Sequence, residues 1–317
     1  MRWLVLLVLL PLATRAEDAA TLISDPAIPA GVVAVWTPEA TSVDVAGDRF
    51  IGGPAVERGD PWHVGSLGKA MTATLAARLV ANGVISWDAR AGDVLRAPAP
   101  WADVTLAQFL THRSGMAPNL ATWRSLLRPG RDAYVRAMLR REPAGRRGDF
   151  LYSNAGYVIA GAMMEAATGR SWEDLIAAEV FEPLGMSGAG FGSPDPGPRG
   201  HRNGAAVAPG WRADNLPAMG PAGAVHLPAD DMLRFLAAHA SRDPDFLPSA
   251  LWDRLHAPVG DYAMGWNVAE DGLSHLGSNT LWFAGMRVAD GAAAFVAVNS
   301  GDAAARAAVE TALMSIP

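Results

Sequence analysis

Residues 66–82 read SLGKAMTATLAARLVAN, and they decide how the rest of the chain is interpreted. Apolar side chains fall on nearly every face of a helix with this sequence, and Gly83 stands where a C-terminal cap is expected. The stretch therefore predicts a helix buried at the centre of the molecule, with Ser66 at its amino end. Within it lies Lys69, which is the single lysine of 317 residues in a chain that uses arginine 25 times.

The spacing of Ser66 and Lys69 indicates an activated nucleophile. Residues three apart share one face of a helix, so the Lys69 amine is within reach of the Ser66 hydroxyl. A desolvated ammonium can lose its proton, whereas a guanidinium keeps it. We therefore expect Lys69 to be at least partly neutral beside Ser66. The alternative is that Lys69 is a chance survivor in a chain biased toward arginine, alanine and glycine.

Two later segments also carry side chains that suit catalysis. Tyr152-Ser153-Asn154 combines a phenol that can shuttle a proton with an amide that donates and accepts hydrogen bonds, although a helix-capping loop would look the same. His275-Leu276-Gly277-Ser278 opens a strand-rich segment, where the glycine would let a substrate lie close to the sheet edge. His275 could donate to a substrate oxygen or carboxylate, although a lone histidine is more often structural.

The pattern of the remaining chain predicts an α+β fold with two lobes. Strand-like runs are expected at Gly31–Trp36, Thr41–Ala46, Met264–Ala269, Thr280–Val288 and Ala292–Val298, and a last helix at Asp302–Met314. Helices are expected at Leu106–His112, Arg131–Arg141, Gly156–Thr168 and Ala229–Ala240. Because strands occur near both ends, they must meet in one sheet. We expect a sheet lobe of about 17–83 and 255–317 and a helical lobe of about 84–254.

The amino-terminal residues and the overall composition limit the classes of function. Residues 1–16 combine a positive start, a short apolar run and a small final residue, which predicts a signal peptide and an exported, periplasmic or secreted protein. The run is too short to span a bilayer, so we expect no transmembrane segment in the mature chain. Without Arg2 and Arg15 the chain has 24 basic and 32 acidic residues, a charge of about minus eight that argues against nucleic-acid binding. The absence of cysteine excludes disulfides and a cysteine nucleophile.

Taken together, Ser66-x-x-Lys69, Tyr152-x-Asn154 and His275-x-Gly277 resemble the three motifs of serine β-lactamases and penicillin-binding proteins, especially the class C β-lactamase superfamily. The segments Leu110–Gly115, Pro183–Met186 and Gly277–Asn279 look like further landmarks of that family, so the resemblance covers nearly the whole mature chain. It implies a β-lactamase/transpeptidase-like fold, an antiparallel sheet flanked by helices with an all-helical lobe, and an active site between the lobes.

The resemblance also implies a role for each motif residue. Ser66 would be the nucleophile, Lys69 would hold or accept its proton, and Tyr152 would relay protons to the leaving group. Asn154 would orient the acyl side of the substrate, and the backbone amides of Ser66 and Ser278 would form the oxyanion hole. The implied reaction is two-step acyl transfer through an acyl-enzyme, with no metal or other cofactor.

One departure from the family pattern bears on the substrate. In β-lactamases the third motif usually begins with lysine, which helps bind the carboxylate of the drug, and here it begins with His275. A neutral histidine carries no fixed charge, and family VIII carboxylesterases often depart from lysine at that place. We therefore expect an esterase-like activity on a small ester or amide, with a β-lactam or a D-amino-acid peptide as the alternative substrate.

Other readings of the motifs are weaker. Gly68-Lys69 lacks the preceding glycine and following hydroxyl residue of a phosphate loop, and neither a Gly-x-Ser-x-Gly elbow nor a His-Glu-x-x-His zinc motif occurs. The histidines show no metal spacing. A member of another class, which binds peptidoglycan fragments or a protein partner without catalysis, stays open. The segment Asp214–Gly223 is a candidate wall of the site, with no role that the sequence assigns.

Overall fold

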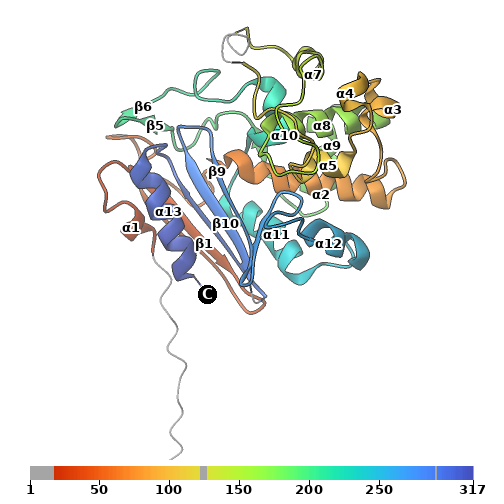
Figure 1. The fold of residues 1–317 in the computed structure, drawn as a ribbon. Helices are drawn as coiled ribbons and strands as arrows, with labels where there is room; N and C mark the ends of the chain where they lie inside the picture. The colour runs from red at the N-terminus through yellow and green to blue at the C-terminus, as the bar shows by residue number, and fades with distance from the viewer. Residues whose placement is uncertain (1–17, 122–126, 290, 317) are drawn as a thin grey trace, which may run out of the picture.

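The computed structural model describes residues 18–121, 127–289 and 291–316. Its central feature is a six-stranded antiparallel sheet of order β2-β1-β11-β10-β9-β8 (Figure 1). The strands are β1 (Ala30–Trp36), β2 (Thr41–Gly47), β8 (Asn267–Ala269), β9 (Gly272–Ser278), β10 (Phe283–Ala289) and β11 (Ala292–Val298). The α+β class expected from the sequence, an antiparallel sheet flanked by helices, is confirmed. The predicted signal peptide, residues 1–16, lies outside the described residues.

Strands from the two ends of the chain meet at the centre of the sheet, as the sequence predicts. β1 pairs with β11, with Val33 opposite Val296. Side chains alternate between the two faces of a strand. In β11, Phe295 and Ala297 therefore belong to one hydrophobic core, whereas Val296 and Val298 belong to a second core on the other face. Because both faces are covered, β11 is a continuous apolar run rather than an alternating one.

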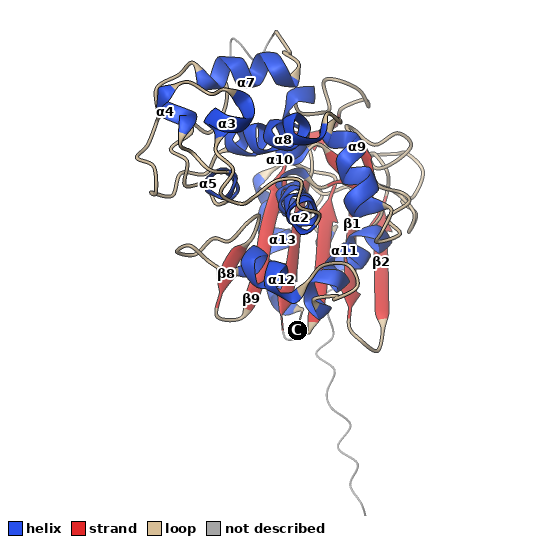
Figure 2. Cartoon of the chain, turned by 90° about the vertical axis from the view of Figure 1, so that its right-hand side faces the viewer, coloured by secondary structure: helices blue, strands red, loops and turns tan. Residues whose placement is uncertain are grey.

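Helices cover both faces of this sheet (Figure 2). On one side lie α1 (Ala19–Leu22) and α13 (Ala303–Ser315), which complete the smaller core with β1 and β11. On the other side lie α2 (Gly68–Ala81) and α11 (Ala229–Ser241), whose apolar residues belong to the larger core. Helix α11 falls in the range that we assigned to the helical lobe, and it packs on the sheet instead because its buried face includes Phe235 and Leu236.

Most of the other elements form the helical lobe beside the sheet and the short strands that join the two parts. The helices and helical turns of the lobe are α3 (Ala91–Leu95), α4 (Ala99–Ala102), α5 (Leu106–Leu110), α7 (Arg131–Leu139), α8 (Asn154–Thr168), α9 (Trp172–Ile176), η2 (Ala177–Phe181), η3 (Pro217–Met219) and α10 (Gly220–Gly223). Helix α12 (Ser249–His256) instead lies beside α11 over the sheet (Figure 2). Small sheets are formed by β3 (Trp62–His63), β7 (Val225–Leu227) and β4 (Gly190–Phe191), and by β5 (His201–Arg202) and β6 (Ala205–Ala206). None of the helices that the structure describes is long and apolar enough to cross a membrane.

The helix predicted over residues 66–82 is present, with a difference at its start. A 3-10 turn, η1 (Gly65–Leu67), precedes α2, so Ser66 lies in the turn rather than in the α-helix itself. At the other end Gly83 has φ +68°, its N–H bonds to the Val80 carbonyl, and the N–H of the next residue bonds to Leu79. This is a Schellman cap, which confirms the position of Gly83 at the helix end.

Strand prediction was least accurate just after the third motif. The run predicted at Thr280–Val288 begins as a strand only at Phe283. Residues 279–282 instead form a turn, because the Asn279 side chain accepts hydrogen bonds from the N–H groups of Leu281 and Trp282, and Thr280 has φ +75°. Strand β9 was not predicted as a separate strand, since its two glycines and two serines are weak strand formers.

Candidate active site

Ser66 lies in the tight turn between β3 and α2, and the turn depends on Gly65. Gly65 has φ +52°, and a Cβ at this position would lie 2.5 Å from the backbone nitrogen of Ser278 in β9. Only glycine adopts this conformation and this close approach without cost. The turn is therefore pressed against β9, and Ser66 is partly exposed while the residues on both sides of it are buried.

The Lys69 amine is buried directly beside the Ser66 hydroxyl. Its Nζ lies 2.8 Å from Ser66 Oγ and donates a hydrogen bond to the carbonyl of Ala222 in α10 at 2.7 Å. Burial lowers the pKa of Lys69 well below its ordinary value. Because a carbonyl can only accept, one N–H of a neutral amine is bound by Ala222 and the lone pair is left for the Ser66 hydroxyl proton. This geometry fits the expectation of a neutral Lys69.

Tyr152 brings a second ionisable group to Ser66. Burial raises the pKa of Tyr152 to about 12, although a hydrogen bond with Ser66 offsets part of the rise. Its ring also lies beside the lysine, with Nζ of Lys69 5.0 Å from the ring centroid. The phenol is therefore protonated near neutral pH and lies within hydrogen-bonding distance of Ser66.

The loop that carries Tyr152 is fixed by His112, a residue to which sequence reasoning gave no role. Nδ1 of His112 accepts the N–H of Ser153 at 3.0 Å, and the ring centroids of His112 and Tyr152 are 4.2 Å apart. Ser153 in turn caps α8, because its Oγ accepts the N–H of Gly156. Burial, with the nearby Lys69, lowers the pKa of His112 well below its ordinary value. The signal that could have found His112 was its place in the Leu110–Gly115 landmark.

Asn154 is the first residue of α8, two residues earlier than the helix start predicted at Gly156. Its Nδ2 donates to Oδ1 of Asn119 at 2.9 Å. Within the described part of the chain, the Asn154 side chain makes this hydrogen bond and none to Ser66 or Lys69. The amine of Lys69 bonds to Ser66 and to Ala222 instead. Asn154 thus lies at the edge of the site because it follows Tyr152 by two residues, but its side chain is not bonded to the Ser66–Lys69 pair.

Gly277 and Ser278 bring strand β9 against the start of the nucleophile turn. A Cβ at Gly277 would lie 2.2 Å from the Val64 carbonyl and 2.9 Å from the backbone nitrogen of Ser66. The first N–H groups of a helix have no acceptor within it, which leaves the Ser66 amide for an outside partner. Two backbone amides, of Ser66 and Ser278, thus come from adjacent segments, as an oxyanion hole requires. The Ser278 hydroxyl donates to the carbonyl of Trp282 within its own turn.

His275 is held more deeply than the sequence suggested. It is 4% exposed, its Nδ1 lies 2.7 Å from the Leu276 carbonyl, and its Nε2 lies 3.2 Å from the hydroxyl of Tyr262. Because a carbonyl only accepts, Nδ1 carries the proton and Nε2 accepts from the tyrosine. Burial is the main cause that lowers the pKa of His275 to about 3. Both ring nitrogens are therefore occupied, so His275 as placed here supports Tyr262 and offers no free donor to a substrate.

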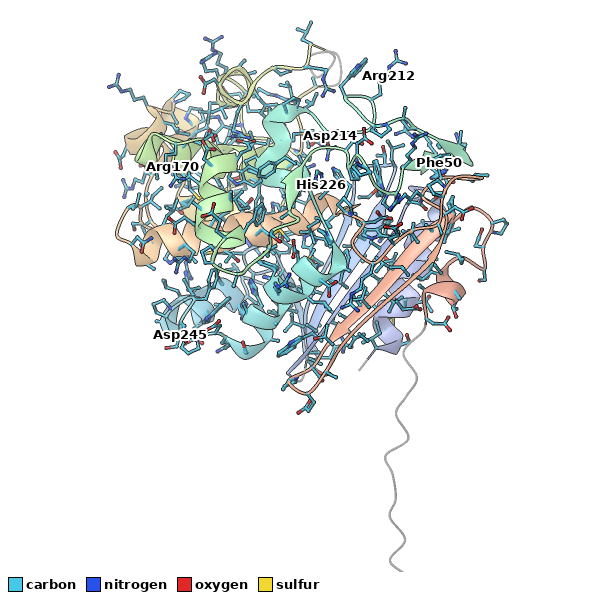
Figure 3. The ribbon with its side chains drawn as sticks, turned by 180° about the vertical axis from the view of Figure 1, so that it is seen from behind. Phe50, Arg170, Arg212, Asp214, His226 and Asp245 are labelled. Atoms are coloured by element: carbon cyan, nitrogen blue, oxygen red, sulfur yellow. The ribbon has the colours of Figure 1, made fainter. Side chains whose placement is uncertain are left out.

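A histidine–aspartate pair beside the nucleophile turn was missed entirely. Nε2 of His63 lies 3.2 Å from Oδ1 of Asp214, and Nδ1 of the same ring accepts the N–H of Gly65 at 3.2 Å. Asp214 belongs to the wall segment Asp214–Gly223, and it lies near His226 in Figure 3. The two residues are 151 positions apart, so no local pattern could have joined them. Within the described ranges, no three His, Cys, Asp or Glu side chains are arranged to hold a metal.

Comparisons with known proteins agree with this geometry. The family model described as Beta-lactamase matches residues 16–315. Penicillin-binding protein 4 of Amycolatopsis lactamdurans is 33% identical over 217 residues, which are 59% of this chain and 52% of that protein, so the match spans about half the length of the relative.

Two solved structures share the fold. The octameric penicillin-binding protein homologue of Pyrococcus abyssi has a TM-score of 0.80 at 19% identity, covering 93% of this chain and 74% of the other. The class C beta-lactamase of Rhodobacter sphaeroides has a TM-score of 0.77 at 20% identity, covering 93% and 97%.

Proposed function

The chain belongs to the beta-lactamase family, and on that premise we propose that it is a serine hydrolase that acts through a Ser66 acyl-enzyme on an ester or amide. The observation that carries the proposal is the 2.8 Å contact between Ser66 Oγ and the buried Nζ of Lys69. A hydroxyl is a weak nucleophile unless a base removes its proton, and a buried amine with a lowered pKa is such a base. A lysine side chain this deeply buried would only destabilise the fold if it had no role in the reaction.

The proposed reaction begins with attack of Ser66 Oγ on the substrate carbonyl carbon. The hydroxyl proton passes to Nζ of Lys69 as the new carbon–oxygen bond forms, and the carbonyl oxygen becomes an oxyanion. The backbone amides of Ser66 and Ser278 would hold that oxyanion, and each such donor is worth roughly 3 to 4 kcal/mol in the transition state. When the bond to the leaving group breaks, Tyr152 would hand it a proton, which Lys69 replaces.

The second half of the reaction regenerates the enzyme. Water attacks the acyl carbon and gives up a proton to the Tyr152–Lys69 pair, and the bond from that carbon to Ser66 Oγ breaks. Ser66 then recovers its proton, and the free acid leaves. Asn154, which bonds to Asn119 at the edge of the site, would orient the acyl side of the substrate.

An esterase-like substrate is favoured by the state of His275. Its pKa of about 3 leaves it neutral, so the third motif supplies no positive charge to the site. A β-lactamase or D-alanyl peptidase activity is the second candidate, which the similarity to a penicillin-binding protein supports. A non-catalytic role in binding peptidoglycan fragments or a partner is the candidate of another class. We also propose that the mature chain is exported and periplasmic or secreted.

The test compares the mature protein with its Ser66→Ala variant on p-nitrophenyl butyrate, a chromogenic cephalosporin and a D-alanyl dipeptide. We expect ester hydrolysis that disappears in the variant, and labelling of Ser66 by a fluorophosphonate. Equal rates in the two proteins would refute the acyl-enzyme. Hydrolysis of the cephalosporin or dipeptide but not the ester would select the second candidate, and absence of both turnover and labelling would select the binding role.

A further inference from the structure

A cavity of about 410 Å³ borders the site, since its lining includes Asn119, which bonds to Asn154, and Asn279, which follows Ser278. The described residues that line it lie at 119–120, 128–134, 202–219 and 279–281. The arginines that line it are Arg128, Arg202 and Arg212, and the one acidic residue is Asp214. The carboxylate of Asp214 lies against His63, so the cavity has an excess of positive charge.

Within the part of the chain that the structure describes, none of the three arginines forms an ion pair with a carboxylate, whereas eleven other arginines do. Arg202 donates to the Thr280 hydroxyl at 2.5 Å, and Arg128 donates to the carbonyls of Trp211 and Asn215. Arg212 lies over the ring of Trp211 at 5.1 Å. Each guanidinium has five N–H donors, so several are left for a ligand.

The cavity is joined to the Ser66 turn by direct contacts. Asn215 in its wall donates to the Gly223 carbonyl at 2.6 Å, and a Cβ at Gly223 would lie 3.3 Å from the backbone nitrogen of Ser66. Asn119, in the opposite wall, accepts from Asn154. A substrate whose carbonyl lies at Ser66 would therefore extend from the oxyanion position into the cavity.

We propose that this cavity is a substrate subsite for a carboxylate, held by Arg202 and Arg212, and that the natural substrate is an ester or amide that carries one. The inference rests on the proposed function of Ser66, because the subsite is defined relative to that nucleophile. A guanidinium binds a carboxylate through two parallel N–H donors, which gives orientation as well as affinity. Arg128 is left out of the contact because it holds the two loop segments together.

The experiment uses two esters of the same length that differ in one charge. p-Nitrophenyl hydrogen glutarate ends in a carboxylate, and p-nitrophenyl methyl glutarate ends in a neutral ester. The wild-type protein should hydrolyse the acid with a kcat/KM about tenfold higher than the methyl ester, mainly through KM, which is the scale of one charge-assisted hydrogen bond. The preference should weaken in high salt.

The test variant is Arg202→Gln with Arg212→Gln, which removes both charges from exposed side chains. It should lose the preference, with kcat/KM for the acid falling to the level of that for the methyl ester. The matched control is Arg170→Gln, because Arg170 is exposed and has no ion pair among the described residues. Arg170 and Arg212 lie on well-separated parts of the molecule in Figure 3, so the control should keep the wild-type preference.

Binding to the Ser66→Ala protein separates the two proposals, since it needs no turnover. Calorimetry should show that monomethyl glutarate, which keeps one carboxylate, binds more tightly than dimethyl glutarate, which has none, and that the double arginine variant abolishes the difference. Hydrolysis that depends on Ser66 but has no preference for the acid, with no arginine-dependent binding of monomethyl glutarate, would overturn the subsite alone. Hydrolysis that survives Ser66→Ala would overturn the proposed function, whatever the binding shows.

Discussion

The carboxylate of Asp214 lies 3.2 Å from the imidazole of His63, and this pair supports the backbone turn that carries Ser66. Asp214 accepts from Nε2 of the ring, which leaves Nδ1 as the acceptor for the N–H of Gly65. The ring is 1% exposed and stacks on Trp282 with centroids 5.5 Å apart. The tautomer and the position of the His63 ring therefore determine whether it can hold the left-handed turn at Gly65, which is one residue before Ser66.

Replacement of Asp214 by asparagine tests this link. The amide can donate to Nε2 of His63, which favours the tautomer that no longer accepts from Gly65. We expect kcat for a neutral ester to fall by about tenfold, with KM and melting temperature little changed, because the effect is on the placement of Ser66. The matched control is Asp230→Asn, which breaks only the surface pair with Arg58. Equal kcat in the two variants would show that the pair has no positioning role.

The state of Lys69 is tested by its replacement with arginine and with methionine. A guanidinium stays protonated, so Lys69→Arg should lower kcat by about 100-fold or more. Lys69→Met should be equally inactive but should fold at least as stably, because it removes a buried amine and keeps the volume. The readouts are the rate of fluorophosphonate labelling and the melting temperature. Full activity of Lys69→Arg would rule out a neutral lysine as the base.

Tyr152→Phe isolates the phenol. The ring and its contact with His112 stay, and the hydroxyl that bonds to Ser66 is lost. We expect a fall of about 100-fold or more in kcat for an ester with a poor leaving group. The fall should be smaller for a p-nitrophenyl ester, whose leaving group needs no proton. Stopped-flow measurement of the acylation step checks both values, and an equal loss on the two esters would contradict proton transfer to the leaving group.

The contact between β9 and the nucleophile turn is tested at Gly277. An added Cβ would lie 2.2 Å from the Val64 carbonyl, so backbone must shift. We expect Gly277→Ala to lose about 1–3 kcal/mol of unfolding free energy and most of its esterase activity. Gly59→Ala is the control, since a Cβ there has nothing within 4 Å and stability should change by less than about 0.5 kcal/mol. Denaturant titration measures both variants, and an unchanged Gly277→Ala protein would mean that β9 is not in contact with the turn.

A buried histidine pair predicts how stability depends on pH. Nε2 of His256 lies 2.9 Å from Nδ1 of His239, and burial lowers the pKa of His256 from 6.5 to about 4. Between these two values the unfolded chain binds a proton that the folded chain does not, so stability falls as the pH drops from 6.5 to 4. The difference of about 2.5 pKa units corresponds to about 3 kcal/mol.

His256→Gln should remove that contribution while keeping a donor for His239. Denaturant titration at pH 7 and pH 4 measures how much unfolding free energy each protein loses as the pH falls. The loss in the variant should be about 3 kcal/mol smaller than the loss in the wild-type protein. Parallel pH curves for the two proteins would show that His256 does not contribute in this window.

The parts of the site that follow local rules were predictable from the sequence. Ser66 and Lys69 are three residues apart, and the shape of a helical turn alone brings them together at 2.8 Å. The pairing of β1 with β11 follows from apolar runs near both ends of the chain. Gly83 was identifiable as a cap because a left-handed residue ends a helix most cheaply when it is glycine.

Other parts depend on contacts between distant residues and left no local signal. His63 and Asp214 meet because β3 and the Asp214–Gly223 segment both pack beside the Ser66 turn. His275 was expected to face the substrate, and the tertiary structure instead encloses it with Tyr262. The arginines of the cavity come from strand β5 (Arg202) and from two loops (Arg128 and Arg212), and neither their spacing nor their neighbours in the sequence connect them.

The central position of β11 has a consequence for how the chain matures. Ser66 is synthesised early, yet β1 has no neighbour on its inner side until residues 292–298 are available. The strand that flanks the Ser66 turn, β9, reaches β1 only through β10 and β11. Nearly the whole polypeptide must therefore emerge before Ser66 and its partners assemble, and we expect this long-range pairing to be a slow step in folding.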